Sequence, residues 1–232
     1  MTMVQFHGDK CYFEEKVQGC VVKARTACLV LRYKDADNAL HVLTILDSPT
    51  KKNLEFPGGK VEQTDRTIID TLLRESWEEI ILKDNLVKNA SIKNWQAVYN
   101  QIITSEDMDS KIFTWIISQI PGCLTTTYGN SPLRTVYYIV DVSEAQAHHL
   151  ISIHGMVPVS VDLMKTIVQF NKKQKNVRFT RRTTYFHIGG DSYRFRGRDF
   201  EGMFKYLPIL ERSTKRMNWT VHLKKIPTTT VP

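Results

Sequence analysis

The stretch FPGGKVEQTDRTIIDTLLRESWEEIIL, residues 56–82, decides the fold of this chain. A Pro-Gly-Gly turn opens it, and the spacing of the apolar residues that follow predicts a helix over 65–81. Three acidic residues that lie three or four positions apart would share one face of that helix: Glu75, Glu78 and Glu79. The opposite face carries an apolar stripe that would dock on a sheet, made of Ile69, Leu72, Leu73, Ser76 and Ile80.

The chemistry of the acidic face indicates a metal site. Carboxylates that converge repel one another and raise each other's pKa unless a cation lies between them. Oxygen ligands of this kind suit Mg²⁺ or Mn²⁺, and Zn²⁺ less well. Arg74 could orient the carboxylates, and the two glycines let the backbone approach a metal or a phosphate closely. A charged helix face alone is more often solvated, and a Pro-Gly-Gly sequence alone is more often a turn. Their joint occurrence after two predicted strands favours the metal site.

Runs rich in β-branched and other apolar residues flank this segment and predict a sheet. Strands are predicted at 19–33, 39–46, 93–103, 112–120 and 134–142. A helix should open at Pro158 and run through Phe170, since proline is tolerated in a first turn. A hairpin around Gly189-Gly190-Asp191 is predicted from 176–188 and 192–198, with a closing helix near 199–211. This mixture predicts an α/β (α+β) protein.

The charge of the chain is unevenly distributed. The 32 Lys and Arg residues exceed the 24 Asp and Glu residues, which gives a net charge of +8. Residues 165–225 alone hold 16 basic and 4 acidic residues, so this segment carries +12 and the remainder carries −4. A basic balance is typical of proteins that meet nucleic acid, an anionic membrane or phosphorylated small molecules. The asymmetry predicts catalysis or structure in the acidic part and anion capture in the basic part.

The basic part interleaves arginine with aromatic residues in RFTRRTTYFHIGGDSYRFRGRDF, residues 178–200. On a strand, Arg194, Arg196 and Arg198 would point to one face, with Tyr193 and Phe195 on the other. Guanidinium groups beside exposed rings suit phosphate contacts and base stacking on single-stranded RNA. An ordinary amphipathic hairpin, with core aromatics and solvated arginines, explains the pattern about equally well. The candidate RNA-binding residues are Arg181, Arg182, Arg194, Arg196 and Arg198.

Several classes of protein are not expected from this sequence. The chain does not start with a basic segment followed by an apolar one, and no stretch approaches 18 apolar residues, so neither a signal peptide nor a membrane contact is predicted. The four cysteines show no CxxC spacing, which argues against a zinc ribbon and favours a reducing, intracellular location, cytoplasmic or alternatively nuclear. The neighbouring imidazoles of His148, His149 and His154 suggest a structural or surface role rather than a metal site.

The 56–82 stretch resembles the Nudix box, GX5EX7REUXEEXGU, in which U is a bulky apolar residue. The matching positions are Gly59 for the opening glycine and Arg74, Glu75, Glu78 and Glu79 for the REUXEE core. Four departures stand beside these matches. Asp65 replaces the expected Glu, eight rather than seven residues separate it from Arg74, Ser76 replaces an apolar residue, and Ile81 replaces the final glycine.

The resemblance implies a Nudix-like mixed-sheet sandwich with flanking helices, plus a basic C-terminal extension. The expected organisation is an N-terminal segment over 1–18, a catalytic core over 19–157, and a basic region over 158–232 packed on the same domain. The implied activity is hydrolysis of a phosphoanhydride in a nucleoside diphosphate linked to another moiety, dependent on Mg²⁺ or Mn²⁺.

The resemblance also implies roles for individual residues. Glu75, Glu78, Glu79 and the Gly59 carbonyl would bind the metals, although Glu78 or Glu79 could act as the catalytic base instead. Arg74 would hold the box together. Some members of the family take their base from a loop outside the box, and the candidates here are Glu106, Asp107, Asp109 and Glu144.

The box itself does not specify the substrate, so the basic region is the main lead. It favours an RNA 5′ cap or a 5′ pyrophosphate, as in the decapping branches of the family. The alternatives are a small nucleotide, a dinucleoside polyphosphate or an inositol pyrophosphate. A different class of alternative is a non-catalytic RNA-binding protein with the Nudix fold.

Overall fold

The computed structural model describes residues 4–8, 10–47, 52–82, 94–129, 132–173, 186–196 and 207–212. Its central element is the long strand β3 (Cys20–Lys34), which confirms the strand predicted at 19–33. Four strands form hydrogen bonds with β3. Three are antiparallel to it, β2 (Lys10–Val17), β4 (Leu40–Leu46) and β6 (Gly58–Lys60), and β8 (Leu133–Asp141) is parallel. The mixed sheet confirms the predicted α/β class.

Shorter strands extend this sheet at several edges. β1 (Gln5–His7) pairs with β2, β7 (Leu124–Tyr128) with β8, and β9 (Val157–Ser160) with β4. β5 (Asn53–Glu55) pairs with β4 and, in parallel, with β11 (Asp191–Phe195). β11 and β10 (Phe186–Ile188) form the predicted hairpin. The hairpin therefore joins the strand that leads directly into the Pro-Gly-Gly turn.

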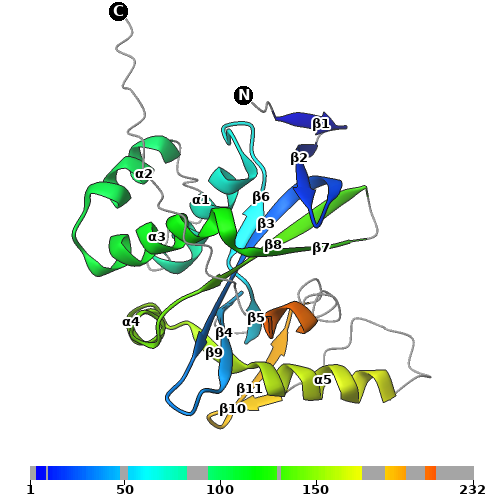
Figure 1. The fold of residues 1–232 in the computed structure, drawn as a ribbon, viewed down its shortest axis with the longest axis vertical. Helices are drawn as coiled ribbons and strands as arrows, with labels where there is room; N and C mark the ends of the chain where they lie inside the picture. The colour runs from blue at the N-terminus through cyan, green and yellow to red at the C-terminus, as the bar shows by residue number, and fades with distance from the viewer. Residues whose placement is uncertain are drawn as a thin grey trace, which may run out of the picture.

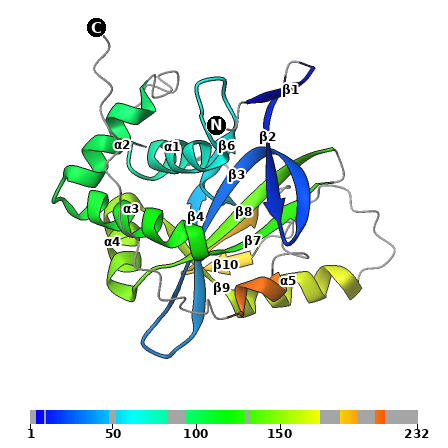
Figure 2. The same ribbon diagram turned by 45° about the horizontal axis from the view of Figure 1, so that its top comes forward.

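Helices cover both faces of the sheet (Figure 1). One face carries α1 (Ile68–Ile80), α2 (Trp95–Thr104), α3 (Met108–Gln119) and α4 (Glu144–His154), and the other carries α5 (Val161–Lys173) with a helical turn at 207–210. The turned view in Figure 2 shows α1 and α5 on opposite sides of β3 and β8. Alternation along β3 explains the two layers, because Leu29 and Leu31 pack under α1 to α3 whereas Cys28 and Val30 pack with α5 and the hairpin.

Two of the predicted strands are wrong: the chain forms helices α2 and α3 where strands were expected at 93–103 and 112–120. Isoleucine-rich runs suggested strands, but the buried residues of α3, Ile112, Phe113 and Ile116, recur at helical spacing. Each helix also has an N-cap. The Asn94 side chain accepts a hydrogen bond from the Ala97 N–H, and the Asp107 side chain accepts one from the Ser110 N–H. A short 3₁₀ turn, η1 (Ile120–Gly122), follows α3.

The C-terminal predictions are partly correct. Pro158 lies within β9, and the helix expected to open there begins at Val161 instead. The hairpin is present at 186–188 and 191–195, while the remaining positions of the predicted hairpin, apart from the turn itself and Arg196, lie outside the described residues. Of the closing helix, only 207–211 is among the described residues. Where helices are described, none is both long enough and apolar enough to cross a membrane.

Candidate functional site

The acidic helix α1 starts with a capping box. The Thr67 side chain accepts a hydrogen bond from the Asp70 N–H, and the Asp70 carboxylate accepts one from the Thr67 N–H. The helix therefore begins at Ile68, three residues later than predicted, and Asp65 lies in the turn before it. This start sets the rotation of α1, so that its apolar stripe faces the sheet and its acidic residues face the Pro-Gly-Gly turn.

A buried ion pair joins the turn before α1, which holds Asp65, to the helix itself. Arg74 is 1% exposed, its Nε lies 3.0 Å from Asp65 Oδ1, and its Nη2 lies 3.1 Å from Asp65 Oδ2. Asp65 also accepts hydrogen bonds from the Thr71 hydroxyl at 2.7 Å and from the Glu62 N–H at 2.8 Å. The structure thus accounts for two departures from the box, the Asp in place of Glu and the one additional residue before Arg74. With this spacing the shorter side chain of Asp65 reaches both Nε and Nη2 of Arg74.

Arg74 also faces the acidic side of the helix. Its Nη1 lies 3.2 Å from Glu75 Oε1 and 3.5 Å from Glu78 Oε2. Burial opposes the charge on Arg74, but the hydrogen bonds and charge of Asp65 outweigh burial and raise its pKa. Arg74 therefore stays charged, and the carboxylates around it favour that charge.

Glu75 is pressed against the backbone of β6. A Cβ atom added to Gly59 would lie 2.1 Å from the Glu75 Cδ, so glycine lets this carboxyl group lie directly on the backbone. Burial raises the pKa of the Glu75 carboxyl to about 7, Arg74 opposes that rise, and the Glu78 charge adds to it. A carboxylate in this position gains stability from a nearby cation. The surroundings of Glu75 therefore fit a bound hard cation.

Glu79 is held by the other glycine of the turn. The Gly58 N–H donates to Glu79 Oε2 at 2.7 Å. Gly58 has a φ of +141°, and a Cβ there would lie 2.1 Å from the carbonyl oxygen of Ala27 in β3. The Pro-Gly-Gly turn therefore brings the backbone close to two of the three box carboxylates.

Substitution of the two neighbouring glycines should have different consequences. Gly58→Ala places a methyl group on rigid backbone at a positive φ, so we expect a loss of stability of about 2–3 kcal/mol or more. Gly59→Ala meets only the end of the Glu75 side chain, which can move. We expect a loss of roughly 10²-fold in turnover with a much smaller stability change, because a displacement of about 1 Å in a catalytic group costs that much. Urea unfolding and turnover of both variants test this contrast, and equal stability losses would contradict it.

The candidate bases outside the box have partners of their own. Glu106 is exposed and pairs with Lys111, and Glu144 lies 3.8 Å from His148. Asp107 caps α3, and hydrogen bonds from the Ser105 hydroxyl and from Ser110 lower its pKa to about 2. Each of these three side chains therefore has a partner outside the box. A carboxyl with so low a pKa is a poor proton acceptor at neutral pH.

The basic hairpin contacts β5 through its arginines. Arg194 Nε donates to Asn53 Oδ1, and Arg196 Nη1 donates to Glu55 Oε2. Between them, Phe195 is 1% exposed and packs with Phe56 and Phe186. The predicted alternation of arginine and aromatic faces is therefore present. The other three candidates, Arg181, Arg182 and Arg198, lie outside the described residues.

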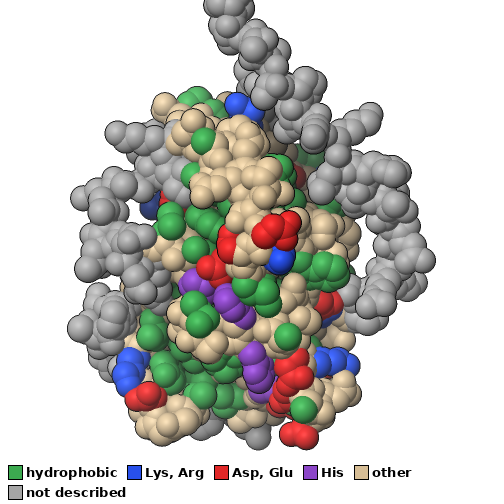
Figure 3. Space-filling view, turned by 90° about the vertical axis from the view of Figure 1, so that its left-hand side faces the viewer, with side chains coloured by type: hydrophobic (Ala, Val, Ile, Leu, Met, Phe, Trp, Pro, Cys, Tyr) green, Lys and Arg blue, Asp and Glu red, His purple; other side chains and the backbone are tan. Residues whose placement is uncertain are grey.

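The sequence did not predict one cluster of titratable side chains, which consists of Asp109, His149 and His154. The imidazoles of His149 and His154 both contact the carboxylate of Asp109, which comes from a different helix. The adjacent His148 lies 3.8 Å from Glu144 instead and is largely exposed. Figure 3 shows histidine side chains beside acidic ones on the side of the molecule that carries α2, α3 and α4. A separation of five residues on a helix gives no sequence signal for such a convergence.

Comparison with known protein families shows which domain the chain contains. A family model described as the NUDIX domain matches residues 22–127, from β3 through α1, α2 and α3 to β7. A comparison with curated proteins found no match to this chain. Hydrolases with this domain typically use divalent metals, in agreement with the acidic surroundings of Glu75. The chain therefore carries a NUDIX domain over residues 22–127, and this domain indicates a pyrophosphohydrolase that acts on acid anhydrides.

Proposed function

We propose that hydrolysis takes place at the acidic face of α1, where Glu75, Glu78, Glu79 and the Gly59 carbonyl hold Mg²⁺ or Mn²⁺. The observation that carries this proposal is the position of the Glu75 carboxyl directly against Gly59, where an added Cβ would lie 2.1 Å from the Glu75 Cδ. Arg74 acts as a positioning residue, because it is fixed by Asp65 on one side and faces Glu75 and Glu78 on the other.

The proposed reaction is an in-line displacement at phosphorus. When bound, the metal neutralises diphosphate oxygens and lowers the pKa of a coordinated water. The water oxygen forms a bond to one phosphorus, the anhydride P–O bond breaks, and the bond electrons leave with the departing phosphate. Either Glu78 or Glu79 acts as the base in place of binding the metal, and it takes the proton of the attacking water. Arg74 keeps the carboxylates in place, so that little reorganisation is needed during the reaction.

We propose an RNA 5′ cap or 5′ pyrophosphate as the substrate, with recognition by the basic region over 158–232 as part of the same domain. The +12 charge of residues 165–225 supports this choice, since the backbone of RNA is a polyanion. Arg196, although paired with Glu55, keeps 48% of its side chain exposed and remains a candidate phosphate contact. Arg181, Arg182, Arg194 and Arg198 complete the proposed set.

A substrate panel tests this proposal. The purified chain with Mg²⁺ or Mn²⁺ is incubated with cap-labelled RNA, 5′-triphosphate RNA, dinucleoside polyphosphates, ADP-ribose and an inositol pyrophosphate. We expect metal-dependent release from the RNA substrates, absent in excess chelator and in Glu78→Gln. Activity against RNA should also fall steeply with salt, because bound phosphates release counterions.

Each contrary result has a separate meaning. Turnover confined to a small nucleotide or to an inositol pyrophosphate would keep the acidic face as the active site and overturn the RNA assignment. Turnover that persists in excess chelator would overturn the metal assignment. A folded chain that binds RNA and hydrolyses none of the panel would favour a non-catalytic RNA-binding role.

A further inference from the structure

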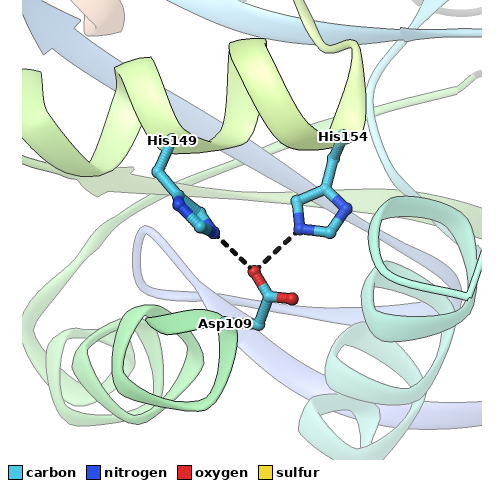
Figure 4. Close-up of side chains that lie close together, drawn as sticks. All are labelled: Asp109, His149 and His154. Carbon is cyan, nitrogen blue, oxygen red and sulfur yellow. Dashed lines mark hydrogen bonds and ion pairs between the residues drawn. The ribbon is translucent and has the colours of Figure 1, made fainter. Parts of the chain in front are cut away.

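Two histidines and one aspartate converge between α3 and α4. Asp109 Oδ1 lies 2.8 Å from His149 Nε2 and 2.7 Å from His154 Nε2. The two imidazole rings are 5.8 Å apart at their centroids and are inclined by 65°. Figure 4 shows both rings directed at the same carboxylate oxygen. One oxygen thus accepts hydrogen bonds from two imidazole nitrogens, one from the middle of α4 and one from its last residue.

The helices fix these side chains in place. Asp109 lies in the first turn of α3, where the helix dipole favours a carboxylate. His154 is the last residue of α4, which ends at Gly155 with a φ of +60°. The side chains are 25% (Asp109), 23% (His149) and 10% (His154) exposed. The cluster is therefore preorganised, partly buried, and still accessible to a small solute.

The ligand atoms suit a tetrahedral transition metal. All three lie within 4.8 Å of one another. Bonds of about 2.0–2.1 Å to a tetrahedral Zn²⁺ place neighbouring ligand atoms roughly 3.3 Å apart. The Nε2–Oδ1 distances would therefore lengthen by only about 0.5 Å, which small side-chain rotations allow. Three protein ligands would leave the fourth position for water or another small ligand.

From this geometry we propose that Asp109, His149 and His154 form a second metal site, selective for Zn²⁺ over Mg²⁺. Imidazole nitrogen favours zinc-like ions, whereas the box offers only oxygen ligands, which favour Mg²⁺ or Mn²⁺. The two sites therefore differ in chemistry and do not compete for the same ion. The inference does not depend on the substrate or on the catalytic roles proposed above.

The site would join α4 to α3, and α3 packs on α1, the helix that carries the box glutamates. Phe113, one turn after Asp109 in α3, packs edge-on against Trp77 of α1 with ring centroids 4.7 Å apart. Trp77 lies between Glu75 and Glu78 in the box. An ion at the second site would therefore stabilise the layer of helices that supports the acidic face.

Cobalt binding tests the proposal, with Co²⁺ as a spectroscopic substitute for Zn²⁺. The full chain is stripped with chelator and titrated with Co²⁺ in excess Mg²⁺, which saturates the box. We expect one Co²⁺ per chain, with a visible absorption band, no thiolate charge-transfer band, and displacement by Zn²⁺. Zn²⁺ should also raise the melting temperature, because folding brings the three ligands together and the folded chain then binds the ion more tightly than the unfolded chain.

Four variants locate the site. His149→Ala and His154→Gln should each weaken Co²⁺ binding by about 100-fold. Loss of a residue that only supports a ligand weakens metal binding by about 10–100-fold, and loss of a ligand itself should weaken it at least as much. His148→Ala is the matched control, since this exposed neighbour contacts Glu144 and not Asp109, and it should bind Co²⁺ like the unaltered chain. Glu78→Gln should also bind Co²⁺ unchanged, which separates this site from the box.

The result that would overturn the proposal is equal Co²⁺ affinity in His149→Ala, His154→Gln and the unaltered chain, or no binding at all. Should both variants fail to fold, the unaltered chain still decides the matter. One equivalent of Zn²⁺ should then shift the imidazole NMR signals of two of the seven histidines. Unshifted imidazole signals would assign the cluster a purely structural, hydrogen-bonded role.

Discussion

Glu78→Gln and Glu79→Gln should each lower turnover by roughly 10³-fold, since loss of a metal ligand removes several kcal/mol of transition-state stabilisation and each 1.4 kcal/mol is worth tenfold. The fold should survive both changes. A glutamine oxygen at position 79 can still accept the hydrogen bond from the Gly58 N–H. Glu78 is 21% exposed and 3.5 Å from Arg74, and partly exposed ion pairs of this kind contribute about 0–1 kcal/mol. Steady-state kinetics at saturating Mg²⁺, with circular dichroism of each variant, measure both effects.

Glu62→Gln is the matched control for these two variants. Glu62 Oε1 also faces Arg74 Nη1, at 3.9 Å, but Glu62 is not a proposed ligand. Its turnover should stay within about threefold of the unaltered chain, because a weak, partly exposed pair is lost and nothing else. Equal losses of turnover in all three variants would mean that negative charge around Arg74, rather than metal binding by Glu78 and Glu79, supports turnover.

Arg74→Ala should be the most destabilising single substitution in the box. It removes the ion-pair partner of Asp65 and leaves a buried carboxylate with no cation, which costs about 3–5 kcal/mol. For a chain of this size that loss lowers the melting temperature by roughly 6–20 °C. Thermal and urea unfolding measure it.

The double variant Arg74→Met with Asp65→Asn separates burial from ion pairing. It removes both charges together, so we expect it to recover part of the stability that Arg74→Ala loses. Arg66→Ala is the surface control, because Arg66 is exposed and its side chain reaches Gln96 at 3.4 Å, and its effect should stay within about 0.5 kcal/mol. A loss below about 1 kcal/mol in Arg74→Ala would show that the buried pair does not support the box.

Local sequence patterns predicted the parts of the fold that repeat over short distances. Alternation and apolar runs identified β3, β4 and β8, and the helical spacing of Leu72 and Ser76 identified the buried face of α1. The same logic failed for α2 and α3, where isoleucine-rich runs fit a strand as well as a helix. Their N-caps, Asn94 and Asp107, were the signals in the sequence that favour helices.

The sequence by itself indicated a Nudix-type domain and the acidic face of α1, because both depend on residue types at fixed separations along one helix. Only the tertiary structure decided the rest. Packing places Glu75 against Gly59, lets Asp65 replace a longer glutamate as the partner of Arg74, and pairs Arg196 with Glu55. It also brings Asp109 to two histidines some forty residues further along the chain. The physical reason is that such contacts depend on how separate elements pack together, and no local periodicity encodes that arrangement.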